Sequence, residues 1–240
     1  MTSGRAFVGT SGWAYASWKP LFYPEGTKSA GFLAYYATRL ATLEVNYTFN
    51  HLPTEKNIAG WKEATPQGFV FALKASQQIT HVRQLRDPAE TVPLFFERAR
   101  PLGERLGPVL FQTPPWLKRD DDRLAGFLAT LPRDQRSALE VRDPSWYVED
   151  VYELLRTARV ALVHAEGERA PSPVETLGTT APFAYARLRT RPGYSDAEVD
   201  AWAARLRPML EAGKDVYAYF RHDETGANAL SAERLRDALG

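Results

Sequence analysis

The chain alternates short apolar runs with longer amphipathic stretches. The runs are rich in β-branched and aromatic residues, and they begin near Ala6–Gly9, Leu43–Asn46, Phe69–Leu73, Val109–Phe111, Ala138–Val141, Ala161–Val163, Phe183–Leu188 and Val216–Phe220. Their mean spacing of about 30 residues leaves room for a helix between most neighbouring runs. The alternation therefore predicts parallel strands that are connected by helices.

The intervening stretches carry helix signals of their own. Ser195 and Glu198 have the spacing of a capping box. Apolar residues follow at helical intervals, at Val199, Trp202, Leu206 and Met209. Comparable stripes over 92–102 and 151–158 predict helices in the third and fifth units.

One connection departs from this alternation. The segment from Glu166 to Pro182 contains three prolines, two glycines and no helical period. A long loop in place of a regular helix is predicted after the sixth strand. Such a loop is either a lid over a site or a plain surface excursion.

Length and unit count together favour a closed barrel. The 240 residues match the roughly 250 that eight strand–helix units typically need. We therefore predict an α/β fold, a single (β/α)8 TIM-type barrel domain over residues 1–240. An open, doubly wound sheet is the alternative, because it has the same alternation.

Composition limits the functional classes. The chain has 30 Lys and Arg against 29 Asp and Glu, so its net charge of +1 gives no global attraction to nucleic acid or an anionic membrane. It has no cysteine, which excludes disulfides and thiol catalysis. Residues Met1 to Phe7 are too short an apolar stretch for a signal peptide, and no apolar run is long enough to span a bilayer. A cytoplasmic protein without a membrane partner is predicted.

Polar side chains at the carboxyl ends of the strands are the candidates for a site, because TIM barrels build their sites there. Glu44, Glu140, Lys74 and His81 are the candidate catalytic residues, and each carboxylate is either a general acid or base or half of a buried ion pair. The candidate ligand-binding residues are Gly9, Ser11, Trp13, Asn46, Gln112, Arg142, Trp146, Arg187, Arg189, Tyr219 and Arg221. Strand alternation places Glu44 with Asn46, and Glu140 with Arg142, on one face.

Cations are frequent among these residues. Lys74, Arg142, Arg187, Arg189 and Arg221 all follow predicted strands. Arginine offers paired donors to carboxylate and phosphate groups, so a small anionic ligand is expected. The glycines beside Ser11 could expose backbone N–H groups to an anion or form only a tight turn, and they lack the Lys of a P-loop.

Metal binding is not indicated. Glu44, Glu140 and His164 could converge on an ion, but the chain has neither His-x-His nor His-Glu-x-x-His spacing. We therefore assign no metal ligands, and the sequence does not identify a cofactor.

Six ordered motifs resemble one known family. They are Gly-Thr-Ser-Gly-Trp from Gly9, Glu44-Val-Asn-Tyr-Thr-Phe, Phe71-Ala-Leu-Lys with Ile79-Thr-His, Leu110-Phe-Gln-Thr-Pro-Pro, Glu140-Val-Arg-Asp-Pro-Ser-Trp and Tyr217-Ala-Tyr-Phe. Together they resemble the YecE-like family, domain of unknown function 72, over nearly the whole chain. The resemblance implies a TIM-type barrel related to xylose-isomerase and endonuclease IV-like barrels, with no established activity. The chain has Arg189-Thr190 where that family usually has His-Gly, and Arg221-His222-Asp223 where Asn-Asp is usual.

Three functions fit these observations. The favoured one is an enzyme that uses acid–base chemistry on a small anionic, phosphorylated or sugar-like substrate. The second, suggested by fold analogy and local basic residues, is a nucleic-acid binder or endonuclease IV-like protein, and it is not favoured because the chain has no dense basic run. The third is a barrel that binds a ligand without catalysis.

Overall fold

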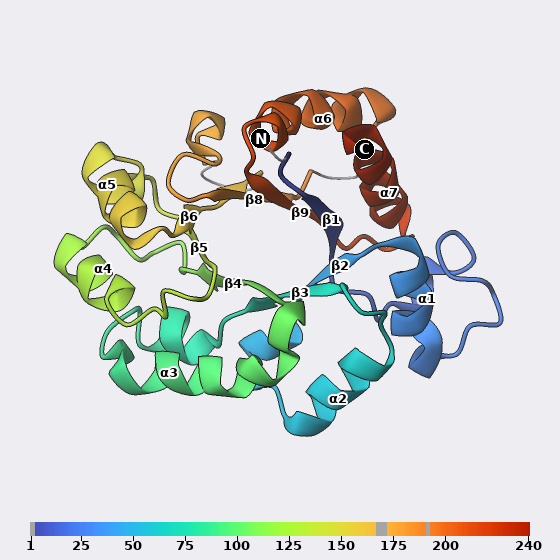
Figure 1. Cartoon of the computed structure of the whole chain (residues 1–240), viewed down its shortest axis with the longest axis horizontal. Coiled ribbons are helices and arrows are strands. Elements are labelled where there is room, and N and C mark those ends of the chain that lie inside the picture. Colours follow the sequence, from blue (N-terminus) through green and yellow to red (C-terminus); the bar gives the residue numbers. More distant parts are fainter. Residues whose placement is uncertain (1–2, 167–171, 191–192) are drawn as a thin grey trace.

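A computed structural model describes residues 3–166, 172–190 and 193–240, in which parallel strands form a ring inside a layer of helices (Figure 1). The strands are β1 (Ala6–Ser11), β2 (Thr42–Val45), β3 (Val70–Lys74), β4 (Leu106–Gln112), β5 (Ser137–Glu140), β6 (Ala161–Leu162), β7 (His164–Ala165), β8 (Phe183–Leu188) and β9 (Asp215–Arg221). Each apolar run that the sequence singles out overlaps a strand, and the sixth run, Ala161–Val163, covers β6 and the residue that separates it from β7.

The break between β6 and β7 shows how the ring closes. Hydrogen bonds follow the order β6-β5-β4-β3-β2-β1-β9-β8-β7. Only Val163 separates β6, which pairs with β5, from β7, which pairs with β8. The N–H of Val163 donates to the carbonyl of Leu139 at 2.9 Å. The segment thus passes from one neighbour to the other and completes a TIM-type barrel, in place of the open sheet that remained as an alternative.

The helices cover the outside of the ring. They are α1 (Phe32–Arg39), α2 (Glu55–Glu63), α3 (Pro88–Ala99), α4 (Asp121–Leu128), α5 (Glu149–Ala158), α6 (Asp196–Glu211) and α7 (Ala227–Leu239). The predicted capping box is present, since Ser195 and Glu198 each accept the other's backbone N–H at the start of α6. None of the described helices is both long and apolar enough to cross a membrane.

The predicted loop after the sixth strand is described only in part. Residues 172–182 contain a single 3-10 turn, Val174–Thr176, and no α-helix. Residues 167–171 of this segment, and residues 1–2 at the amino end, lie outside the described part of the chain.

Apolar side chains form two cores, one between the barrel and the helices and one inside the barrel. The inner core combines large rings, among them Tyr185 and Tyr219, with small residues such as Ala72 and Ala138. Pairing large with small residues fills the narrow interior at the density of a packed core. The polar residues described below lie toward the carboxyl ends of the same strands.

Candidate functional site

A buried ion cluster lies toward the carboxyl end of the barrel. Arg187, in the last part of β8, bridges Glu44 of β2 and Glu140 of β5 across the interior. Its Nη2 lies 2.7 Å from Glu44 Oε1, and its Nη1 lies 2.6 Å from Glu140 Oε2. All three side chains are at most 4% exposed. The fork of one guanidinium can serve two carboxylates at once, which a lysine cannot do with the same geometry.

Neutral side chains satisfy the remaining carboxylate oxygens. The Tyr185 hydroxyl donates to Glu44 Oε2 at 2.8 Å. The Gln112 amide donates to Glu140 Oε1, also at 2.8 Å. Every carboxylate oxygen of the two glutamates therefore has a partner, as buried charges require.

This environment keeps the Glu140 carboxyl ionised. Burial alone would raise the pKa of Glu140, but Arg187, Arg189 and the hydrogen bond from Gln112 lower it to about 2. A carboxylate with so low a pKa stays ionised at neutral pH and is a weak proton acceptor. The sequence left open whether Glu44 and Glu140 are acid–base groups or members of ion pairs, and the contacts favour ion pairs for both.

Lys74 presents a more reactive group at the end of β3. Its Nζ donates to Gln112 Oε1 at 2.8 Å and lies 3.9 Å from the centre of the Phe49 ring. Burial, together with the nearby charge of Arg187, lowers the pKa of Lys74 to about 8. A substantial fraction of neutral amine is therefore present near physiological pH, which suits a general base.

His81 also contacts the Phe49 ring. It belongs to the helical turn Gln78–Val82 that follows β3, and its Nδ1 is 2.9 Å from the Thr80 hydroxyl. The imidazole meets the Phe49 ring edge to face, with 4.9 Å between centroids. Burial and the charge of Lys74 lower the pKa of His81, so the imidazole is neutral at pH 7 and able to accept or relay a proton.

Two further arginines flank the cluster. Nη1 of Arg189 lies 3.6 Å from Glu140 Oε1, and Nε of Arg142 lies 4.0 Å from the same oxygen. Their side chains are 21% and 29% exposed, in contrast to the buried Arg187. Burial and the charge of Arg187 lower the pKa of Arg189. These partly exposed guanidinium groups are the cations that a bound anion could reach.

Charge is unbalanced within this cluster. In the described part of the chain it contains Lys74, Arg142, Arg187 and Arg189 but only the carboxylates Glu44 and Glu140. Two other acidic residues of the barrel rim are engaged elsewhere. Asp143 accepts the N–H of Ser145, and Asp223 accepts N–H groups at the start of α7. The excess positive charge favours an anionic ligand.

A carboxylate that the sequence analysis missed fixes the segment after β8. Glu166 accepts the N–H of Arg189 at 3.2 Å and the indole N–H of Trp202 at 2.9 Å. It also accepts the hydroxyl groups of Thr190 and Tyr194. These four contacts hold the backbone from which Arg189 projects. No sequence signal marks Glu166, because its partners lie on other elements.

Three predicted ligand-binding residues serve packing instead. Trp146 is fully buried, and its indole donates to the Leu117 carbonyl at 2.7 Å, so no ligand reaches it. Tyr219 is 1% exposed and its hydroxyl contacts Thr42 at the start of β2, below the ion cluster. A Cβ on Gly9 would lie 2.2 Å from the Thr42 carbonyl oxygen, so this glycine permits close approach of β1 and β2.

Other predicted ligand-binding residues lie at the same end of the barrel but outside the ion cluster. Trp13 and Asn46 line a separate pocket of about 360 Å3, together with Tyr15 and Trp61. Asn46 has helical dihedrals, because β2 ends at Val45, so strand alternation does not extend to it. Ser11 and Arg221 are neighbours in register at the ends of β1 and β9.

The histidine and carboxylates that might have held a metal do not come together. His164 packs beside Trp202, with 5.3 Å between ring centroids, whereas Glu44 and Glu140 contact Arg187. The described residues contain no group of three or more acidic or histidine side chains with the geometry of a metal site.

The closed parallel ring and its helical layer define the class: an α/β protein of the TIM-barrel type. A structure of D-psicose 3-epimerase from Clostridium cellulolyticum shares this fold, with a TM-score of 0.54 at 11% identity over 98% of this chain and 96% of that one.

Closer similarities identify the family. Residues 7–240 match the model of the protein family of unknown function DUF72, and the chain belongs to that family. A DUF72 family protein from Thermotoga maritima has a TM-score of 0.85 at 27% identity, covering 98% of this chain and 99% of that one. The UPF0759 protein YunF of Bacillus subtilis is 24% identical over 97% of this chain and 94% of its own length. The UPF0759 protein YecE of Escherichia coli is 30% identical over 60% of this chain and half of its own length.

Proposed function

We propose that the protein is an enzyme that uses acid–base chemistry on a small anionic substrate, phosphorylated or sugar-like, at the carboxyl end of the barrel. The observation that carries this proposal is the placement of Lys74. Its amine is partly buried and has a pKa of about 8. The partly exposed guanidinium groups of Arg142 and Arg189 belong to the same charged cluster.

Each group has a distinct task in this proposal. Arg189 and Arg142 bind the anionic group of the substrate and thereby orient it. Neutral Lys74 accepts a proton from the substrate, and His81 exchanges a proton with solvent or with a leaving oxygen. The acid–base task thus belongs to Lys74 and His81, while Glu44 and Glu140 position Arg187, whose fixed charge keeps the pKa of Lys74 low.

The proposal predicts that inorganic phosphate stabilises the protein. At about 100 times its dissociation constant, a ligand that binds only the folded state adds about 2.7 kcal/mol to the free energy of unfolding. Thermal unfolding followed in increasing phosphate measures this effect. Replacing Arg189 with glutamine should remove the part of the stabilisation that comes from this site.

A matched change on the surface provides the control. Arg83→Gln also removes one guanidinium, but Arg83 is exposed in the turn after β3, and among the described residues its only side-chain hydrogen bond is to the Asp87 carbonyl. Its response to phosphate should equal that of the unmodified chain. Identical phosphate responses in Arg189→Gln and Arg83→Gln would contradict an anion site at Arg189.

A further inference from the structure

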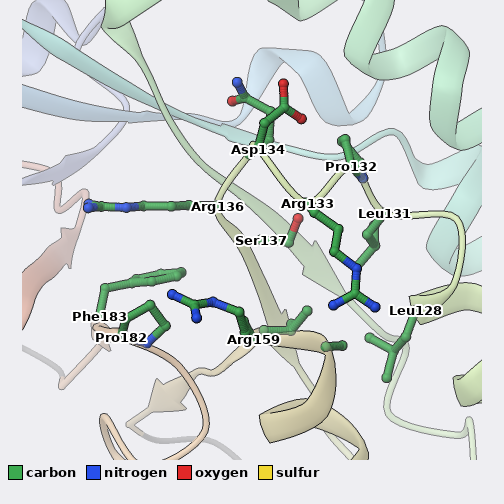
Figure 2. A pocket seen from close by; sticks show the side chains of 13 residues that line it. Leu128, Leu131, Pro132, Arg133, Asp134, Arg136, Ser137, Arg159, Pro182 and Phe183 are labelled. Carbon is green, nitrogen blue, oxygen red and sulfur yellow. The ribbon is translucent and has the colours of Figure 1, made fainter.

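A second basic pocket lies at the opposite end of the barrel from the ion cluster. It has a volume of about 360 Å3, and its lining includes Arg133, Arg136, Ser137, Arg159 and Phe183 (Figure 2). Ser137 and Phe183 are the first residues of β5 and β8, whereas Glu140 and Arg187 of the ion cluster lie at or near the other ends of these strands. The pocket is therefore distinct from the candidate active site.

Two arginines of this pocket lack an internal counter-ion. Within the described part of the chain, neither Arg133 nor Arg159 has a side-chain hydrogen bond, ion pair or ring contact. Arg136 differs, because it pairs with Asp215 at 2.7 Å and lies over the Phe183 ring. Figure 2 shows the Asp134 carboxylate turned away from the guanidinium groups of Arg133 and Arg159. These two cations are available to a ligand.

A buried hydroxyl in the same lining also lacks a partner. Ser137 is 2% exposed, and its Oγ makes no hydrogen bond. Buried polar groups are rarely left unsatisfied, and each exception calls for an explanation. In the view of Figure 2 this oxygen points toward Arg133 and away from the Arg136 guanidinium. The Oγ itself is closed off from solvent, so a ligand oxygen that displaces part of the lining would give the hydroxyl its missing partner.

The backbone conformation of Arg159 is the third feature of this pocket. Arg159 is the C-cap of α5 and has left-handed dihedrals, with φ of 58° and ψ of 34°. Glycine is the residue best suited to such a position, because any side chain is strained there. A cation at a helix carboxyl end also interacts favourably with the helix dipole. A ligand contact would give a further reason for an arginine at this strained position.

We propose that this pocket binds a phosphomonoester, with Arg133 and Arg159 on the phosphate and Ser137 donating to it. A phosphomonoester carries a charge of about −1.5 to −2 at neutral pH, which two unpaired guanidinium groups neutralise. Its organic part would rest on the apolar wall that Leu128, Leu131 and Phe183 provide. An adjoining pocket of about 230 Å3, which also includes Arg159, leaves room for a larger group.

Calorimetric titration of the full chain with phenyl phosphate tests this proposal. We expect binding that Arg159→Gly weakens at least tenfold, as does Arg133→Gln, because each removes a charged donor. Glycine relieves the left-handed strain, so Arg159→Gly should unfold at the same temperature as the unmodified chain or higher, which excludes misfolding as the cause. Ser137→Ala should weaken binding about threefold to tenfold through the lost hydrogen bond.

Arg189→Gln separates the two anion sites. Binding of phenyl phosphate in the pocket at Arg133 and Arg159 should persist in this variant, since Arg189 follows the other end of β8. Binding that is lost in Arg189→Gln and retained in Arg159→Gly would place the ligand at the ion cluster and overturn the second site. Equal affinity for phenol and phenyl phosphate, or no binding of phenyl phosphate, would also overturn it.

Discussion

Arg187→Met is expected to lower the free energy of unfolding by about 3–5 kcal/mol, because it leaves two buried carboxylates without their cation. Both Glu44 and Glu140 are almost fully buried, and Arg187 contacts each within 2.7 Å. Methionine fills similar space but cannot neutralise either charge. Urea unfolding at neutral pH, with the unmodified chain alongside, measures the loss.

Arg234→Met is the matched control on the surface. Arg234 also contacts two carboxylates, Asp196 at 3.2 Å and Asp200 at 2.9 Å, but its side chain is 40% exposed. Solvent screens such pairs, so this change should cost much less stability than Arg187→Met. If the two variants lost equal stability, the cluster around Arg187 would not be the buried network described above.

Lowering the pH should reduce the difference in the free energy of unfolding between the unmodified chain and Arg187→Met. The pKa of Glu140 is about 2 in the folded protein, compared with about 4.3 for an unperturbed glutamate. The stability that this ion pair contributes is thus fully present above about pH 4.3 and is lost as the pH falls through 2. Without Arg187, burial raises the pKa of Glu140, so the stability deficit of Arg187→Met should begin to narrow at a higher pH and should keep narrowing as the pH falls through 2.

Lys74→Met is expected to lower the rate of substrate proton exchange by about 10²–10⁴-fold, the usual contribution of a general base. Incubating the protein in D2O with phosphorylated sugars and 2-oxo acids, and following C–H signals by proton NMR, both finds a substrate and measures the rate. With the unmodified chain the rate should rise with pH and level off above about 8, as Lys74 loses its proton.

A second lysine provides the comparison for this experiment. Lys62 on α2 is exposed and donates to the Pro101 carbonyl at 3.2 Å, outside the ion cluster. Lys62→Met should keep the full exchange rate. A substrate that exchanges equally fast with Lys74→Met and with the unmodified chain would show that another group is the base. Binding of the anions without any exchange would favour a barrel that binds its ligand without catalysis.

Most of the fold follows from local sequence patterns. The run Phe183–Leu188 matches β8 residue for residue, and the capping box at Ser195 and Glu198 marks the start of α6. Both signals arise from neighbouring residues in the chain. The way in which the ring closes could not be predicted from local patterns. It depends on the change of strand partner at Val163, which is a tertiary feature.

Strand alternation predicts which polar side chains come together only within the strands themselves. Glu44, Glu140 and Arg187 lie within strands, and the structure joins them in one cluster. Strand alternation predicts which face of the sheet a side chain is on, but it does not predict how far along the barrel axis the side chain lies. Tyr219 was therefore predicted among the ligand-binding residues, although it lies in the inner core. The sequence did not indicate Tyr185, because its hydroxyl donates to Glu44 from another strand across the barrel.

The titration of the Lys74 amine tests the proposed site most directly. Reductive methylation with 13C-formaldehyde gives each lysine an NMR signal, and Lys74→Arg identifies the one from Lys74. Its pKa should lie near 8 in the free protein and rise when phosphate is added, because a nearby anion favours the charged form. A Lys74 signal with a pKa above 10 that does not change when phosphate is added would contradict both the lowered pKa and the anion site beside Lys74.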